Sequence, residues 1–170
     1  MLSLSLEYPI EAVHMTSFRY ALPDLLRVMQ RLRDPETGCP WDLAQNFQSI
    51  VPSTLEECYE LIEALEHEDF DHVAEELGDV LFQVVFYAQL GAEQHLFSFD
   101  AIVNTLVEKL IRRHPHVFGQ GEIEGRVAQR SEVSDVKRSW EAIKQRERNT
   151  RNDRGVLADI PLALPALTRS

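Results

Sequence analysis

Residues 56–79, EECYELIEALEHEDFDHVAEELGD, constrain the fold more than any other part of this chain. Their pattern predicts two helices joined by a tight turn. In an antiparallel hairpin, residues at equal distances from the turn lie at the same height. Glu57 is then opposite Asp79, and Glu60 is opposite Glu76. Residues three apart on one helix share a face, so the register predicts four carboxylates on one patch.

A patch of four carboxylates is stable only under particular conditions. Like charges raise one another's pKa values unless a cation joins them. Hard oxygen ligands suit Mg2+ best, with Mn2+ as an alternative. A solvated acidic helix face is the simpler interpretation, but the mirror register favours a metal site. Its predicted ligands are Glu57, Glu60, Glu76 and Asp79.

Charge and hydropathy exclude several classes of partner. The formal net charge of -11 argues against a general binder of nucleic acid or of anionic membranes. The longest apolar run, residues 80–92, is interrupted by Gln83 and Gln89. It is too short and too polar to span a bilayer. Cys39 and Cys58 are too few for a disulfide framework, and we interpret them as reduced thiols of a cytoplasmic protein.

The chain of 170 residues is long enough for one domain with a real core. Residues 1–17 have no basic region and no helical pattern, so we expect a disordered leader. Residues 18–148 carry the helical patterns and form the predicted all-α domain. Residues 149–170 are expected to be a linker or tail.

Apolar residues at helical spacing predict more helices around the hairpin. The expected ranges are about 18–33, 53–95 for the hairpin itself, 98–114 and 134–148. Asp42 is a candidate N-cap for a short helix over residues 43–47. Ser53 and Thr54 each precede a Glu by three residues, which matches a capping box.

The second hairpin helix is unusual in two ways. Residues 80–87 are apolar on nearly every face, and one small subunit offers too few helices to cover them. We therefore expect a homodimer in which the partner covers part of this segment. Gly78 also lies inside this helix, where it costs up to about 1 kcal/mol against Ala. A close helix crossing, access to a metal, or a neutral accident would each account for it.

Other chemistry-bearing side chains lie beyond the hairpin. Lys109, Arg112 and Arg113 share a helix face. They fit either the negative end of the helix dipole or a clamp for a triphosphate. Trp41 in a Pro- and Gly-containing loop is either a structural plug or a surface on which a base stacks. Trp140 is most simply a core residue, with contact to a base as the alternative.

The motifs resemble a known family. EECYE at residues 56–60 and EELGD at 75–79 resemble the EExxE…ExxD signature of MazG proteins, which are all-α nucleoside triphosphate pyrophosphohydrolases. Four further segments are similar to the first domain of tandem MazG proteins: LLRVMQRLRDPETGCPWD, STLEECYELIEAL, EELGDVLFQVVFYAQL and KLIRRHPHVFG. The segment SWEAIK matches as well. Tandem members continue past a segment like IPLALPALTRS into a second, similar domain, so the resemblance implies either a naturally short form or a tandem protein truncated before its second domain.

The resemblance implies a dimeric helical hairpin bundle and a set of site residues. It places the metal ligands on Glu57, Glu60, Glu76 and Asp79, phosphate contacts on Lys109, Arg112 and Arg113, and an aromatic near the nucleotide at Trp140. The implied reaction is Mg2+-dependent hydrolysis of an NTP or dNTP to the monophosphate and pyrophosphate, as in housecleaning of nucleotide pools. Glu56 or Glu60 would orient the water as a base. The alternative is a nucleotide-binding or dimerisation module with weak or no turnover.

Overall fold

The computed structural model describes residues 19–125 and 132–151, and every regular element in these ranges is helical. The elements are α1 (Leu22–Leu32), α2 (Pro40–Ala44), α3 (Val51–Glu66), α4 (Phe70–Glu93), α5 (Phe99–Arg113), η1 (Gly119–Gly121) and α6 (Val133–Arg151). The all-α prediction is confirmed. The predicted leader and the tail beyond Arg151 lie outside the described residues. Among the described helices, none combines the length and hydropathy needed to cross a bilayer.

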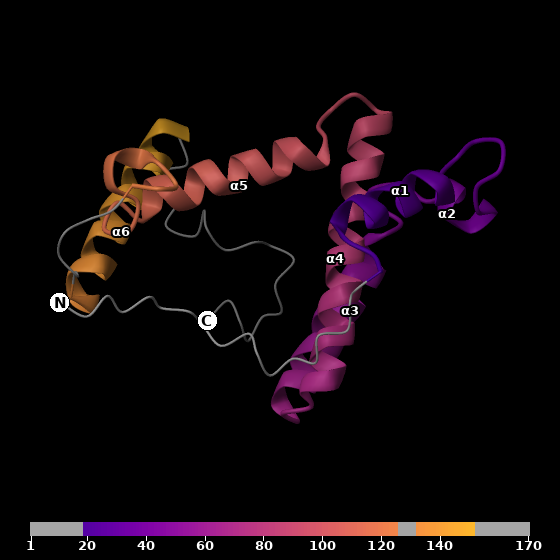
Figure 1. Ribbon diagram of the computed structural model, residues 1–170, viewed down its shortest axis with the longest axis horizontal. Coiled ribbons are helices and arrows are strands. Elements are labelled where there is room, and N and C mark those ends of the chain that lie inside the picture. The colour runs from indigo at the N-terminus through magenta and orange to yellow at the C-terminus, as the bar shows by residue number, and fades with distance from the viewer. Residues whose placement is uncertain (1–18, 126–131, 152–170) are drawn as a thin grey trace. The chain divides into compact units, whose positions relative to one another are not determined.

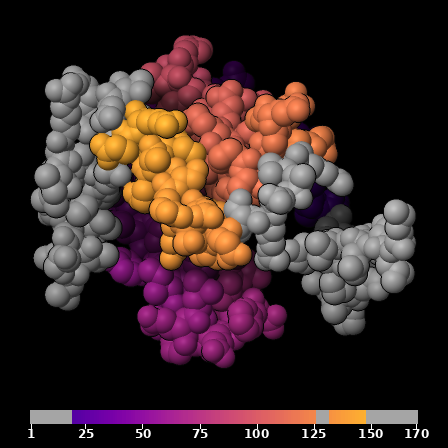
Figure 2. Space-filling model, turned by 90° about the vertical axis from the view of Figure 1, so that its left-hand side faces the viewer, coloured from indigo at the N-terminus to yellow at the C-terminus, as the bar shows by residue number. Residues whose placement is uncertain are grey.

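The chain divides into two compact units, one ending at Phe99 and the other beginning at Asp100. The first unit is organised by α3 and α4, which run side by side as the predicted antiparallel hairpin, with α1 packed on α4 (Figure 1). Asp69 ends the turn, because its Oδ1 accepts a hydrogen bond from the backbone N–H of His72 at 3.2 Å. This is an N-cap contact that satisfies one free N–H of α4. The turn end of the hairpin is a rounded surface, drawn in magenta in Figure 2.

The core of the first unit lies between α1, the start of α3 and the second half of α4. Its fully buried apolar side chains are Met29, Ile50, Val85, Phe86 and Leu90. Partly buried apolar side chains surround them: Leu25, Leu26, Phe47, Phe82, Tyr87 and Phe99. Burying one such large side chain contributes about 1.5–3 kcal/mol. The hairpin is therefore anchored at the end of α4 that is remote from the turn.

Arg33 ties the end of α1 to α4. Its guanidinium forms two parallel hydrogen bonds to Glu93, Nε to Oε1 at 2.8 Å and Nη2 to Oε2 at 2.7 Å. It also donates to the backbone carbonyl of Asp42 and lies 5.4 Å from the ring centroid of Phe86. Only 7% of the Arg33 side chain is exposed. This charge is therefore used structurally and is not available to a ligand.

Two predicted helix starts are wrong. The short helix begins at Pro40 and not at residue 43, so Asp42 is a buried residue inside α2 and not its N-cap. α3 begins at Val51, which places Ser53 and Thr54 inside its first turns. Proline has a fixed φ and no N–H, so it suits the first turn of a helix, and each helix starts at or next to a proline.

The Thr54 hydroxyl works inside α3 and not as a cap. It donates to the carbonyl of Ile50 at 3.1 Å and lies 2.9 Å from the Tyr87 hydroxyl on α4. Gln83, which is 6% exposed, is also within 3.4 Å of this hydroxyl. This small polar network fixes the register of α3 against α4.

The second unit contains α5, η1 and α6, of which α6 is drawn in orange to yellow in Figure 2. Both arginines at the end of α5 bind one carboxylate of α6. Arg112 Nη2 lies 2.7 Å from Glu147 Oε1, and Arg113 Nη2 lies 2.5 Å from Oε2. The ring of His114 lies 6.1 Å from that of Trp140. These contacts hold the end of α5 against α6.

Candidate metal centre

Three carboxylates meet on the α3–α4 hairpin. Glu57 comes from α3, and Glu76 and Asp79 come from α4. Each offers one oxygen atom, and these three oxygens lie within 4.8 Å of one another. The equal distances of Glu57 and Asp79 from the turn place them side by side, as the register predicts. Glu76 joins them because it is three residues before Asp79 on the same helix face.

The Glu76 carboxylate is buried, with 8% of its side chain exposed. Its Oε1 lies 2.7 Å from Nε2 of His72, which precedes it by one helical turn. Its Oε2 is buried and has no hydrogen-bond partner among the residues that the structure describes. An unsatisfied buried polar atom costs about 1–3 kcal/mol, and more when it carries charge. This oxygen therefore needs a positively charged or donor group that the protein itself does not supply.

The charges of the cluster also indicate that it needs a cation. The pKa of Glu57 is raised, first by desolvation and then by the nearby charges of Asp79, Glu60, Glu76 and Glu56. A carboxylate among other carboxylates holds its proton more tightly. A divalent cation would reverse this effect, because it favours the ionised form of every ligand.

The donor set fits a hard divalent cation. All three groups are carboxylates, and one oxygen is buried and without a partner. Mg2+ is commonly held through one or two carboxylates together with waters and substrate phosphates. The chemistry of the site therefore matches Mg2+ or Mn2+, while the nature of the ion stays a prediction.

Glu60 and Glu56 are placed differently from the three clustered residues. Both are exposed on α3. Neither belongs to the group of oxygens within 4.8 Å, although both charges act on the pKa of Glu57. Exposure does not distinguish them from the cluster, because Asp79 is also exposed and belongs to it. Their roles as ligand or base stay predictions.

Gly78 lies beside the cluster with open space around it. A Cβ built on this residue would meet no heavy atom within 4 Å. The described part of the chain therefore contains no close helix crossing at this glycine. The position leaves the backbone next to Asp79 accessible.

The predicted substrate-contacting residues lie elsewhere in the chain. Lys109, Arg112 and Arg113 belong to α5 in the second unit, and both arginines bind Glu147. The two Arg113 hydrogen bonds and the two Arg112 hydrogen bonds lower the pKa of Glu147 to about 2. A phosphate group would have to replace this carboxylate, which presents the same planar pair of acceptor oxygens.

Both tryptophans are more exposed than a core residue. Trp41 on α2 is 58% exposed, which argues against a structural plug. Trp140 on α6 is 40% exposed, so the simple interpretation as a core residue is wrong. The Lys144 ammonium lies 5.8 Å from its ring centroid. Their contact with a base stays a prediction.

The residue that sequence reasoning missed is His72. It precedes Glu76 by four residues on α4, so the two side chains share a face. That spacing was visible in the sequence. The burial that makes the contact important depends on how α3 packs on α4, and the spacing does not reveal it.

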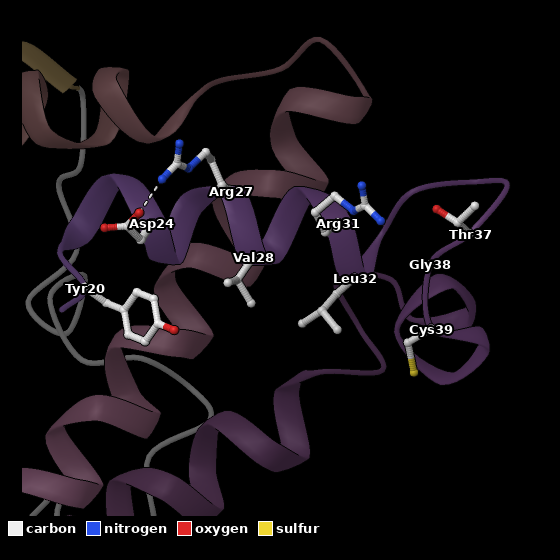
Figure 3. A pocket seen from close by; sticks show the side chains of 9 residues that line it. All are labelled: Tyr20, Asp24, Arg27, Val28, Arg31, Leu32, Thr37, Gly38 and Cys39. Atoms are coloured by element: carbon white, nitrogen blue, oxygen red, sulfur yellow. Dashed lines mark hydrogen bonds and ion pairs between the residues drawn. The ribbon is translucent and has the colours of Figure 1, made fainter.

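An open pocket lies beside α1, and none of the clustered carboxylates lines it (Figure 3). Its volume is about 560 Å³. Arg27 and Arg31 extend from one side of α1, whereas Val28 and Leu32 extend from the other. Arg27 is already paired with Asp24. The pocket is therefore separate from the carboxylate cluster.

Comparison with known proteins decides the family. Residues 45–118 match the profile described as the MazG nucleotide pyrophosphohydrolase domain. The chain is 51% identical over 146 residues to a nucleoside triphosphate pyrophosphohydrolase of Escherichia coli K12. This chain belongs to the MazG family. The matched range contains all three clustered carboxylates and also Glu60.

The relatives in the MazG family are longer than this chain. The match to the Escherichia coli protein covers 86% of this chain and 53% of the relative. A nucleoside triphosphate pyrophosphohydrolase/pyrophosphatase MazG of Thermotoga maritima is 43% identical over 145 residues, with 85% of this chain and 52% of the relative covered. The chain thus spans about half the length of these curated relatives.

A solved structure supports the fold. The crystal structure of a MazG-related protein from Thermotoga maritima aligns with a TM-score of 0.59 and 22% identity. It covers 73% of this chain and 99% of the other. The arrangement of helices is therefore that of a MazG-related protein.

Proposed function

We propose that this protein hydrolyses nucleoside triphosphates to the monophosphate and pyrophosphate, with Mg2+ held by the hairpin carboxylates. The observation that carries the proposal is the buried Oε2 of Glu76, which has no hydrogen-bond partner and belongs to the carboxylate that meets Glu57 and Asp79. The names of the relatives support the choice of reaction. Mn2+ is the alternative ion, because it accepts the same ligands.

The residues that would hold the ion are Glu57, Glu76 and Asp79, with Glu60 as the predicted fourth ligand. A bound Mg2+ would neutralise charge on the phosphate oxygens and lower the pKa of a coordinated water. Glu56 and Glu60 carry carboxylates that influence the pKa of Glu57 and are exposed to water. Either carboxylate would accept a proton from the attacking water. The water oxygen would bond to a phosphorus of the α–β phosphoanhydride while the bridging P–O bond breaks, which releases the monophosphate and pyrophosphate.

The cationic side chains of α5 would stabilise the pyrophosphate leaving group. Lys109, Arg112 and Arg113 are the candidates, since guanidinium groups bind phosphate through paired hydrogen bonds. Each arginine already donates two hydrogen bonds to one oxygen of Glu147, Arg112 to Oε1 and Arg113 to Oε2. Phosphate oxygens of the substrate would therefore replace the two Glu147 oxygens as acceptors. Trp41 and Trp140 remain the aromatic candidates for contact with the base.

The direct test is release of pyrophosphate from a panel of NTPs and dNTPs with Mg2+ or Mn2+. Wild-type protein should release pyrophosphate and no free phosphate. Asp79→Ala and Glu60→Ala should each lose this activity. Glu63→Ala serves as the control, because Glu63 is an exposed carboxylate of α3 outside the cluster. A fully active Asp79→Ala protein would show that the site lies elsewhere.

A module that binds nucleotide without turnover is the second candidate. The composition of the hairpin favours it, because no Lys or Arg lies between Arg33 and Lys109, and the helices that carry the carboxylates offer a phosphate no cationic side chain. The same assay separates the two functions. Binding of nucleotide without pyrophosphate release, across standard and damaged substrates, would support the module.

We further propose that the protein is a cytoplasmic homodimer. Large apolar side chains of the hairpin remain about half exposed, namely Leu55, Tyr59, Ile62, Leu77, Leu81 and Val84. Large contiguous apolar patches are rare on monomeric proteins, so this number of exposed apolar side chains on one hairpin supports a partner subunit. Both cysteines are free, and free thiols are typical of reducing compartments.

A further inference from the structure

His72 and Glu76 form a pair at the edge of the metal centre. The imidazole Nε2 lies 2.7 Å from Glu76 Oε1, which is a good hydrogen-bond distance. The histidine side chain is 48% exposed, whereas the glutamate side chain is 8% exposed. The carboxylate is therefore buried, and the imidazole covers one of its two oxygens from the solvent side.

The pair leaves the two Glu76 oxygens in different states. Oε1 accepts from His72, whereas Oε2 is buried and has no partner. With Oε1 engaged, rotation of the carboxylate would break the hydrogen bond to the imidazole. Oε2 is then the Glu76 oxygen that is left for a cation shared with Glu57 and Asp79.

The position of His72 is itself fixed by local structure. Its backbone N–H donates to Oδ1 of Asp69, the N-cap of α4. His72 therefore lies in the first turn of α4, and Glu76 follows four residues later on the same face. Cap, imidazole and carboxylate form a continuous chain of contacts from the hairpin turn to the metal centre.

We propose that His72 is a positioning residue that orients the Glu76 carboxylate so that Oε2 faces the metal ion. The proposal rests on the proposed function, since it requires a metal at these carboxylates. His72 acts through Glu76 and does not itself hold the ion. Groups that hydrogen-bond a metal ligand typically change metal affinity by about 10–100-fold when they are replaced.

The test compares three variants of the full chain by calorimetric titration with Mg2+ alone. His72→Leu removes both ring nitrogens and introduces an apolar side chain that favours helix. His72→Gln keeps an N–H donor that can reach a carboxylate four residues on. His67→Leu is the matched control, because His67 lies at the C-cap of α3, outside the cluster. Circular dichroism checks that helix content is unchanged in each.

The expected result is a Kd for Mg2+ about 10-fold or more weaker in His72→Leu. His72→Gln should stay within a few-fold of wild type, and His67→Leu should equal it. Wild-type affinity in His72→Leu would overturn the positioning role while leaving the metal site intact. Equal weakening in His72→Leu and His72→Gln would also overturn it, because the donor would then be irrelevant. A wild-type protein that binds no Mg2+ would contradict both this proposal and the proposed function.

Discussion

Among the single side chains of the metal centre, Glu76 is the one whose burial has the largest energetic consequence. Glu76→Gln keeps an acceptor for His72 and places an amide N–H beside the other carboxylates. It should raise the melting temperature without metal, because one buried charge and one unsatisfied oxygen are removed. It should also abolish most of the stabilisation by Mg2+, which is about 2.7 kcal/mol at 100 times Kd for a native-state ligand. Thermal unfolding with and without Mg2+ measures both effects. Glu63→Gln is the control and should respond to Mg2+ as wild type does.

Individual site residues were predictable from the sequence only where the hairpin geometry determined their place. Glu57 and Asp79 lie together because they are equally far from the turn, and no side-chain detail is needed. Glu60 was expected in the same group from the same register, but its carboxylate is not among the three oxygens that lie within 4.8 Å of one another. The Glu76 contact with His72 depends on burial, which one helix's spacing cannot reveal.

At the scale of the helices, Glu147 joins α6 to the two arginines of α5. This contact predicts that the stability of the protein depends on pH. The hydrogen bonds from Arg113 and Arg112 lower the pKa of Glu147 from 4.5 to about 2. A carboxylate whose pKa is depressed by folding stabilises the native state above its unfolded pKa. That contribution is fully present above about pH 4.5, and it is lost as the pH falls through about 2.

Glu147→Gln should therefore be less stable than wild type at pH 7, and the difference should shrink as the pH falls from about 4.5 to about 2. Urea unfolding at several pH values measures this difference. Glu141→Gln is the control, since Glu141 is 64% exposed and lies 3.7 Å from Lys144. An exposed pair of this kind contributes about 0–1 kcal/mol. A constant stability difference between wild type and Glu147→Gln at all pH values would contradict the account.

The helices themselves followed from apolar periodicity, and their ends did not. The hairpin and the ranges of α1, α5 and α6 are close to the predicted ones. The starts of α2 and α3 differ because prolines begin these helices, whereas the polar residues that resembled caps lie inside them. The same polar residue types occur at N-caps and in the first turn, so the sequence does not determine at which residue each helix begins. The packing of the helix determines it.

For the molecule as a whole, the exposed apolar side chains of the hairpin predict a dimer. Leu81 is 39% exposed and Val84 is 38% exposed, although both belong to the most apolar segment of the chain. Light scattering at micromolar concentration should give the mass of a dimer. Leu81→Asp should reduce it to the monomer, because a charge would be buried at the interface. Leu96→Asp is the control, since Leu96 is 62% exposed in the loop after α4. A stable wild-type monomer would refute the prediction.

The predicted dimer concerns a second molecule, and it stays a prediction. A helix apolar on nearly every face requires more cover than the first unit provides, and the exposure of Leu81 and Val84 agrees with that shortage. The identity of the covering surface depends on a second molecule. The apolar periodicity of one chain does not specify that surface.

We propose above all that Glu57, Glu76 and Asp79 hold the metal ion that the proposed reaction requires. Crystals of the wild-type protein grown with Mn2+ and a non-hydrolysable NTP analogue test it most directly, because the anomalous signal of Mn2+ locates the ion independently of the protein. The account predicts an anomalous peak within coordination distance of Glu76 Oε2 and of carboxylate oxygens of Glu57 and Asp79, with phosphate oxygens completing the coordination. A fully occupied Mn2+ bound to the analogue at any other residues, with Glu76 Oε2 still without a partner, would contradict it.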